Sequence, residues 1–116
     1  MRSNTIGSQI VTFEPSGYIT AANINNFQEK LTLAVKSSEF KVFLVDMSRV
    51  EFLDSAGLMA LVSAFRLSQS LGKSFNICAI PASVKIIFEL TQLDRVLNIY
   101  KSREELEIRD DQLVAA

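Results

Sequence analysis

The run Asp54-Ser55-Ala56-Gly57-Leu58 joins an apolar segment to a helical pattern and holds the residues best suited to chemistry. Asp and Ser are both strong N-cap residues, so Asp54 or Ser55 is expected to accept a hydrogen bond from a first-turn N–H group. The other interpretation is a modified serine, because Ala56 and Gly57 are small enough to let another protein approach. A phosphate on Ser55 would suit the positive end of a helix dipole and add about −1.5 to −2 charge beside Asp54.

Few other side chains offer chemistry. The chain has no histidine and a single cysteine, which excludes His-based triads, His-ligated metal sites and disulfides within the chain. Asp46 ends a predicted strand, but the first strand offers only Glu14 toward the acidic pair that a Mg²⁺-dependent phosphoacceptor needs. Asp46 is therefore predicted to organise its loop, and Cys78 to belong to the core. We expect no metal and no cofactor.

Composition places the chain among ordinary globular proteins. It has 116 residues, of which 48% are hydrophobic and 22% charged, which predicts one domain over residues 1–116 with its core at about 8–110 and both ends frayed. A net charge of −1 argues against nucleic-acid and anionic-membrane partners. No apolar run approaches the roughly 18–20 residues of a membrane span, and the N-terminus lacks the apolar core of a signal peptide. We expect a cytoplasmic protein.

Hydrophobic patterns predict the elements that position the Asp54–Ser55 turn. Strands are predicted at residues 9–13, 18–20, 41–47, 74–79 and 96–100, and helices after Asn23, Asp54, Pro81 and Ser102. The turn signal at residues 14–17 predicts that the first two strands form a hairpin, and residues 48–53 are predicted to be a loop. The fold class is therefore α/β, with a mixed, mostly parallel central sheet, an N-terminal β-hairpin and about four helices.

In such a sheet, ligands and partners meet the loops at the carboxyl ends of the strands. These loops are residues 20–23, 47–55, 80–82 and 100–102.

The motif around Asp54 resembles the core motif of the STAS family, named after sulfate transporters and anti-sigma factor antagonists. That motif is an apolar strand ending in Asp, a loop of the form Val-x-Phe-(Leu/Met)-Asp-Ser-(Ser/Ala)-Gly-Leu, and a helix. Weaker matches accompany it, and the resemblance covers about residues 8–110. The matching segments are Val50-Glu51-Phe52-Leu53-Asp54-Ser55-Ala56-Gly57-Leu58, Gly17-Tyr18-Ile19, Pro81-Ala82-Ser83-Val84 and Leu93-Asp94-Arg95-Val96-Leu97.

The resemblance implies a stand-alone anti-sigma factor antagonist that works by partner switching. The unphosphorylated form would bind an anti-sigma factor that is also a serine kinase. Phosphorylation of Ser55 with ATP would release it, and a metal-dependent serine phosphatase would reset it. The domain would then be a substrate and a switch in transcription regulation, not an enzyme. The residues expected to contact the partner are Asp54, Ser55, Ala56, Gly57, Leu58, Thr20, Asn23, Pro81 and Ser83.

Two positions depart from the family pattern. Thr20 stands where the family often has Asp, which alters a possible partner contact and argues against nucleotide binding by the domain itself. Gln92 stands where the family commonly has Gly. If that position needs a positive φ, glutamine is disfavoured there by roughly 1 kcal/mol.

Two other functions stay open from the sequence. One is a constitutive STAS interaction or scaffold module, in which the motif serine is no more than an N-cap. The other is a small-ligand or nucleotide-binding domain with weak hydrolytic activity.

Overall fold

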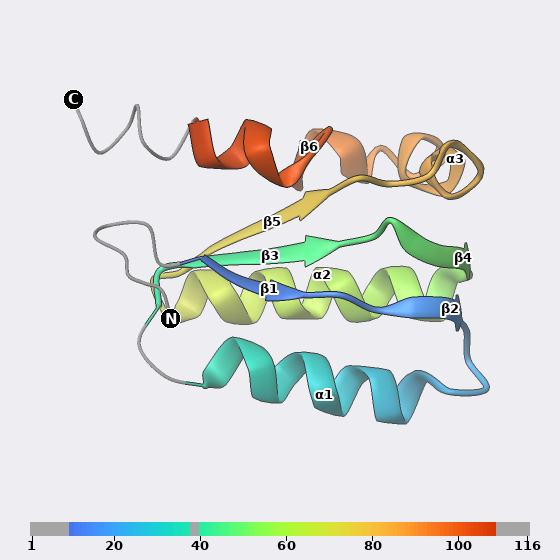
Figure 1. Cartoon of the computed structure of the whole chain (residues 1–116). Coiled ribbons are helices and arrows are strands. Elements are labelled where there is room, and N and C mark those ends of the chain that lie inside the picture. The colour runs from blue at the N-terminus through green and yellow to red at the C-terminus, as the bar shows by residue number, and fades with distance from the viewer. Residues whose placement is uncertain (1–9, 38–39, 109–116) are drawn as a thin grey trace.

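The computed structural model describes residues 10–37 and 40–108. Its strands form a four-stranded sheet in the order β1-β3-β5-β6 and a two-stranded sheet in the order β2-β4. Figure 1 shows β2 and β4 beyond the ends of β1 and β3, so the small sheet extends the large one. The strands are β1 (Ile10–Phe13), β2 (Ser16–Ile19), β3 (Val42–Asp46), β4 (Arg49–Leu53), β5 (Ser74–Cys78) and β6 (Asn98–Tyr100).

All pairings between these strands are parallel. β3 lies between β1 and β5, with Val45 opposite Phe13 on one side and Ile77 on the other. Parallel strands share one carboxyl edge, so the segments that follow β2, β4 and β5 leave from the same side of the sheet. The α/β class and the parallel central sheet predicted from the sequence are confirmed.

The predicted N-terminal hairpin is wrong. β1 pairs with β3 and β2 pairs with β4, both in parallel, so the chain continues past Pro15 without reversing. Pro15 falls between the two pairings, where the missing N–H group removes no ladder hydrogen bond. Gly17 has a φ of 75° at the register shift between Gly17 and Tyr18, so its positive φ serves a β-bulge and not a hairpin turn.

The predicted loop at residues 48–53 is also wrong, because residues 49–53 form β4. The register passes from Val50 opposite Gly17 to Phe52 opposite Tyr18, which leaves Glu51 as the extra residue of the bulge. That extra residue interrupts the two-residue alternation by which a strand is identified in a sequence.

The predicted helices are present. They are α1 (Ile24–Lys36), α2 (Ser55–Ser70), α3 (Ala82–Leu90) and a final helix at residues 103–108. The short 3₁₀ helix η1 (Leu93–Arg95), which follows α3, was not predicted. The predicted capping box of the final helix forms, since Ser102 Oγ accepts from the N–H of Glu105 and Glu105 Oε1 accepts from the N–H of Lys101. The expected fraying at both ends concerns residues outside the described ones.

The core has two parts because β3 is buried on both faces. Phe43 and Val45 belong to a large cluster with Leu31 of α1 and Leu61 of α2. Val42 and Leu44 point to the other face and join a small cluster with Leu106 of the final helix. The nearly continuous apolar run at residues 41–47 is what a strand covered on both faces requires.

Candidate functional site

Asp54 organises the turn between β4 and α2. It is the N-cap of α2, and its Oδ1 accepts a hydrogen bond from the N–H of Gly57 at 3.0 Å. Its Oδ2 accepts from the N–H of Ala21 at 2.9 Å, and its own N–H donates to the carbonyl of Ile19 at 3.2 Å. One residue therefore caps a helix and fastens the segment after β2 to it. Of the two capping candidates in the sequence, Asp54 is the cap.

These hydrogen bonds also set the charge state of Asp54. The N–H of Gly57, and then that of Ala21, stabilise the carboxylate and hold the pKa of Asp54 below its ordinary value. The side chain is therefore a stable anion at neutral pH, directly before Ser55.

Gly57 allows β2 to lie against the first turn of α2. A Cβ at this position would lie 2.5 Å from Cδ1 of Leu53 and 2.9 Å from both Cγ2 and the carbonyl oxygen of Ile19. No other residue type fits without movement of the backbone of β2. The glycine of the motif thus has a packing role in the free chain.

Ser55 is the first residue of α2, and its side chain is exposed. No hydrogen bond within residues 10–37 and 40–108 occupies its hydroxyl. Ala56 beside it is half-buried, whereas Gly57 and Leu58 are buried. Of the motif residues, Ser55 is thus the one whose functional group faces solvent without a partner among the described residues.

Thr20 and Asn23 lie next to this turn, as predicted. Asn23 Oδ1 accepts from the N–H of Thr20 at 2.9 Å, and its Nδ2 donates to the carbonyl of Tyr18 at 2.7 Å. These bonds shape the loop that presents the Ala21 N–H to Asp54. Asn23 is the N-cap residue of α1, but its side chain holds the loop and makes no capping hydrogen bond.

Pro81 and Ser83 lie at the start of α3, which packs against β4. Pro81 is half-buried and Ser83 is exposed. No hydrogen bond in the described part of the chain joins either residue to Asp54 or Ser55. The structure thus brings Thr20 and Asn23 together with the motif and leaves the start of α3 as a separate part of the same edge.

An exposed aromatic pair on the small sheet was not identified from the sequence. Tyr18 of β2 and Phe52 of β4 are 62% and 49% exposed, with ring centroids 5.9 Å apart. The pair depends on the parallel pairing of β2 with β4, and the hairpin prediction would have placed Tyr18 elsewhere. Both aromatics lie one residue before the ends of their strands, close to the Asp54 turn.

The remaining candidates have structural roles. Asp46 Oδ1 accepts from the N–H of Ser48 at 2.9 Å, which confirms its role in organising the loop. Cys78 is buried in the small core cluster, and burial raises the pKa of its thiol to about 11, so it is an inert core residue as predicted. Among the described residues, no three His, Cys, Asp or Glu side chains group as a metal site would require.

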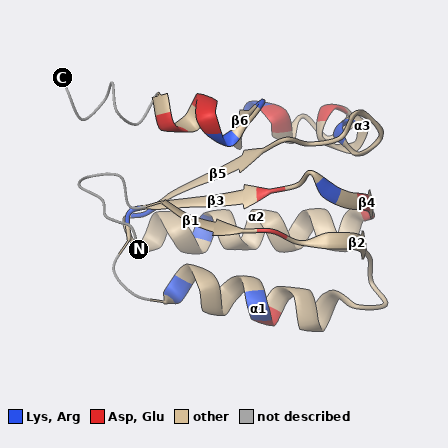
Figure 2. Ribbon diagram, viewed as in Figure 1, with Lys and Arg blue, Asp and Glu red and all other residues tan. Residues whose placement is uncertain are grey.

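Figure 2 marks charged positions of both signs on the ribbon, for example on α1 and the final helix, whereas α2 is almost free of them. None of the helices in the described residues has the length and apolar character needed to cross a bilayer.

The fold is shared with several solved structures. An anti-sigma factor antagonist from Mycobacterium paratuberculosis is 22% identical with a TM-score of 0.75, over 87% of this chain and 85% of that one. The anti-sigma factor antagonist SpoIIAA in its unphosphorylated form is 15% identical with a TM-score of 0.72, over 97% and 95%. The STAS domain of a SulP transporter from Vibrio cholerae is also 15% identical with a TM-score of 0.72, over 97% and 89%.

At these identities the similarity concerns the fold. The family follows from the sequence itself, because the STAS domain model matches residues 3–106. That match spans β1 to the final helix and includes the Asp54–Leu58 motif. This chain belongs to the STAS domain family.

Proposed function

We propose that this protein is a cytoplasmic anti-sigma factor antagonist that is switched by reversible phosphorylation of Ser55. The observation that carries the proposal is the exposed Ser55 hydroxyl at the first position of α2, on a turn fixed by Asp54. A kinase needs an accessible hydroxyl on a segment that its active site can cover. The rigid cap keeps that hydroxyl in one place while the rest of the turn is engaged in the fold.

The proposed partner of the unmodified protein is an anti-sigma factor with serine kinase activity. The kinase would transfer the γ-phosphoryl group of ATP to the Ser55 oxygen, with ADP as the leaving product. A metal-dependent phosphatase would remove the phosphate, so any metal in the cycle belongs to that enzyme. The antagonist contributes a binding surface and an acceptor hydroxyl, and no catalysis.

The local electrostatics explain why a single phosphate on Ser55 would be enough to release the partner. The Asp54 carboxylate already accepts the Gly57 and Ala21 N–H groups, so a phosphate on Ser55 would meet a fixed negative charge with those donors taken. Glu51 is exposed on the preceding strand and adds further negative charge to this part of the surface. A partner whose surface covers the neutral serine would have to bury an unpaired charge once Ser55 is phosphorylated. Burying that charge costs more than the 1.4 kcal/mol that weakens binding tenfold.

Two of the related structures are antagonists, which is in line with the proposed role. One relative is an anti-sigma factor antagonist by description, and another is such an antagonist in its unphosphorylated form. Both retain this fold over at least 85% of their chains. The transporter domain shares the fold as well, so the fold alone does not select the function.

The proposal is tested with the cognate kinase and ATP, followed by mass spectrometry of the modified peptide. We expect one phosphate on Ser55, and modification elsewhere with Ser55 untouched would refute the assignment.

Binding provides the second measurement. Ser55→Ala should stay bound to the kinase in the presence of ATP, and Ser55→Asp should bind at least tenfold more weakly than the unmodified protein. Ser63→Asp is the matched control, because Ser63 is an exposed serine of the same helix two turns further on. Equal affinity of Ser55→Asp and Ser63→Asp would contradict the electrostatic switch.

A further inference from the structure

A cleft lies on the side of the molecule where β1 passes into β2 above helix α1. It has a volume of about 310 Å³, and its walls come from residues 13–19 on the strand side and residues 23–30 on the helix side. It lies where the chain ends its pairing with β3 at Phe13 and begins its pairing with β4 at Ser16. This size is at the lower end of the range for small-molecule sites, roughly 300–1,000 Å³.

The inner part of the cleft is apolar. Phe13 of β1 and Phe27 of α1 both line it, with ring centroids 6.1 Å apart and ring planes tilted by 59°. Ile19 closes the end toward β2 and is almost fully buried. The two rings already contact each other, so a ligand would lie against them and not between them.

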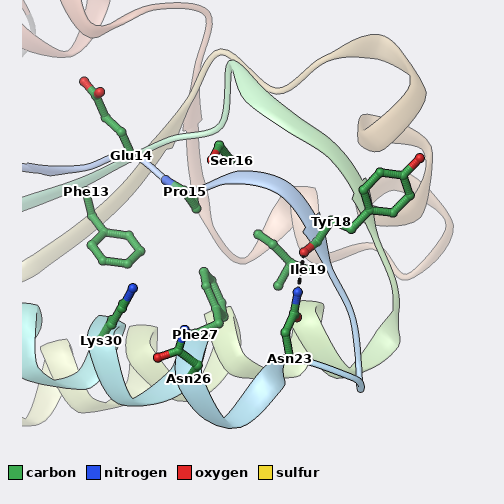
Figure 3. A pocket seen from close by; sticks show the side chains of 10 residues that line it. All are labelled: Phe13, Glu14, Pro15, Ser16, Tyr18, Ile19, Asn23, Asn26, Phe27 and Lys30. Atoms are coloured by element: carbon green, nitrogen blue, oxygen red, sulfur yellow. Dashed lines mark hydrogen bonds between the residues drawn. The ribbon is translucent and has the colours of Figure 1, made fainter.

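Polar residues line both walls of the cleft, Glu14 and Ser16 on the strand side and Asn23, Asn26 and Lys30 on the helix side. Figure 3 shows the Lys30 side chain reaching up toward the Phe13 ring, and Asn26, about one turn earlier on α1, lines the same cleft. Within the described residues, Lys30 is in no ion pair, since the salt bridge there joins Arg103 and Glu107. Glu14 also lines the cleft, but its carboxylate projects away from Lys30 (Figure 3). The helix wall therefore offers an ammonium group and an amide beside an apolar surface.

We propose that this cleft binds a small carboxylic acid with an apolar body. The body would lie against Phe13 and Phe27. The carboxylate would accept hydrogen bonds from Nζ of Lys30 and from Nδ2 of Asn26. The lining combines aromatic and aliphatic side chains with polar and charged ones, so the apolar body and the charged end of one ligand can both find a matching surface. A charge-assisted hydrogen bond to Lys30 favours an anion over its neutral isostere.

The cleft also borders the Asp54 turn. Asn23 lines the cleft, and the same side chain bonds the Tyr18 carbonyl and the Thr20 N–H. A ligand in the cleft would therefore change the amide chemical shift of Thr20 as well as the shifts of the residues that line the walls. This gives binding in the cleft a recognisable spectroscopic pattern.

The test is a titration of the full-length ¹⁵N-labelled protein with phenylacetate, followed by amide chemical shifts. Phenylacetamide, which has the same body without the charge, is titrated in parallel. We expect saturable shifts at residues 13–20 and 23–30 with phenylacetate, and at least fivefold weaker binding of phenylacetamide. Equal affinities, no saturable shift, or shifts confined to other parts of the molecule would overturn the proposal.

Two lysine variants distinguish binding in the cleft from a nonspecific attraction of the anion to surface lysines. Lys30→Met should weaken phenylacetate binding at least fivefold and leave phenylacetamide binding unchanged. Lys36→Met is the control, because Lys36 is an exposed lysine of the same helix outside the cleft. An equal loss in both variants would contradict the assignment of Lys30. Neither Ser55 nor a kinase enters this experiment, so its outcome is independent of the proposed function.

Discussion

Two turns at the same edge of the sheet lead into helices, and they are built differently. Before α2, the Asp54 side chain makes two hydrogen bonds, and Gly57 lets β2 come into contact. Before α3, the Pro81 carbonyl accepts from the N–H groups of Val84 and Lys85, and no side chain caps the helix. That turn also includes Ala79 with a φ of 58°, a conformation that disfavours a side chain.

The difference shows where the chain has a fixed geometry and where it carries strain. The α2 turn is held by the side chain of Asp54, and the Ser55 hydroxyl has no partner among the described residues. Among the described residues, the α3 turn has backbone hydrogen bonds and no side-chain cap, and it keeps Ala79 in the left-handed region. Variants that reverse these features should change stability in opposite directions.

Gly57→Ala should have the largest effect. The added Cβ meets the carbonyl oxygen of Ile19, which belongs to the backbone and cannot rotate away. Overpacking of this kind costs about 1–3 kcal/mol of unfolding free energy. Urea unfolding measures the loss. Gly17→Ala loses stability for a different reason, because Gly17 has a positive φ and no atom lies within 4 Å of an added Cβ. A Gly57→Ala protein as stable as the wild type would contradict the importance of the close contact.

Asp54→Asn should have the next largest effect and should depend on pH. Asparagine has one acceptor oxygen, so the N–H of Gly57 or of Ala21 loses its partner. The pKa of Asp54 is lowered in the folded state, so the stabilisation is complete above the unfolded pKa of about 4 and is lost as pH falls through the folded value. Thermal unfolding should show wild type more stable than Asp54→Asn at pH 7, with the gap closing on acidification below pH 4. A gap that stays constant down to the lowest pH would contradict this role.

Ala79→Gly should make the protein more stable. Glycine relieves a left-handed conformation that costs an L-residue about 1–2 kcal/mol, and loses part of the gain to the greater entropy of the unfolded chain. A net increase of up to about 1 kcal/mol is expected in urea unfolding. Gln92→Gly should act in the same direction, because Gln92 has a φ of 61°. A decrease in stability at both positions would show that the strain argument fails here.

Ser55→Ala should have the smallest effect on stability, within about 0.5 kcal/mol, because the side chain is exposed and its hydroxyl has no described partner. Circular dichroism during heating provides the measurement. A clear loss of stability would mean that the hydroxyl has a structural role in the free protein.

The α2 turn could be predicted well because its signals are local. A cap residue, a small residue three positions later and an apolar stripe all lie within one short segment. The family motif then related this segment to the STAS family and singled out Ser55. Even the departure at Gln92 was informative, since the structure places that residue at a positive φ, as a position that favours glycine requires.

The hairpin and the loop at residues 48–53 were wrong for a different reason. Pro15 and Gly17 are turn residues by type, but their role here is set by which strand the segment pairs with. Strand pairing joins residues about 33 positions apart, and no local pattern reports it. Glu51 then breaks the alternation of β4 as the extra residue of a bulge, which hides the strand.

The sequence by itself therefore determined the helices, the buried strand β3, a helix cap at Asp54 or Ser55 and the membership of a family, because each depends on residues close together in the chain. Only the tertiary structure decided that β2 lies against Gly57, that Ala21 reaches Asp54, and that Phe13 and Phe27 form the wall of a cleft. Those features depend on parallel pairing between distant segments, whose register is set by packing of the whole core and not by the preference of any one residue.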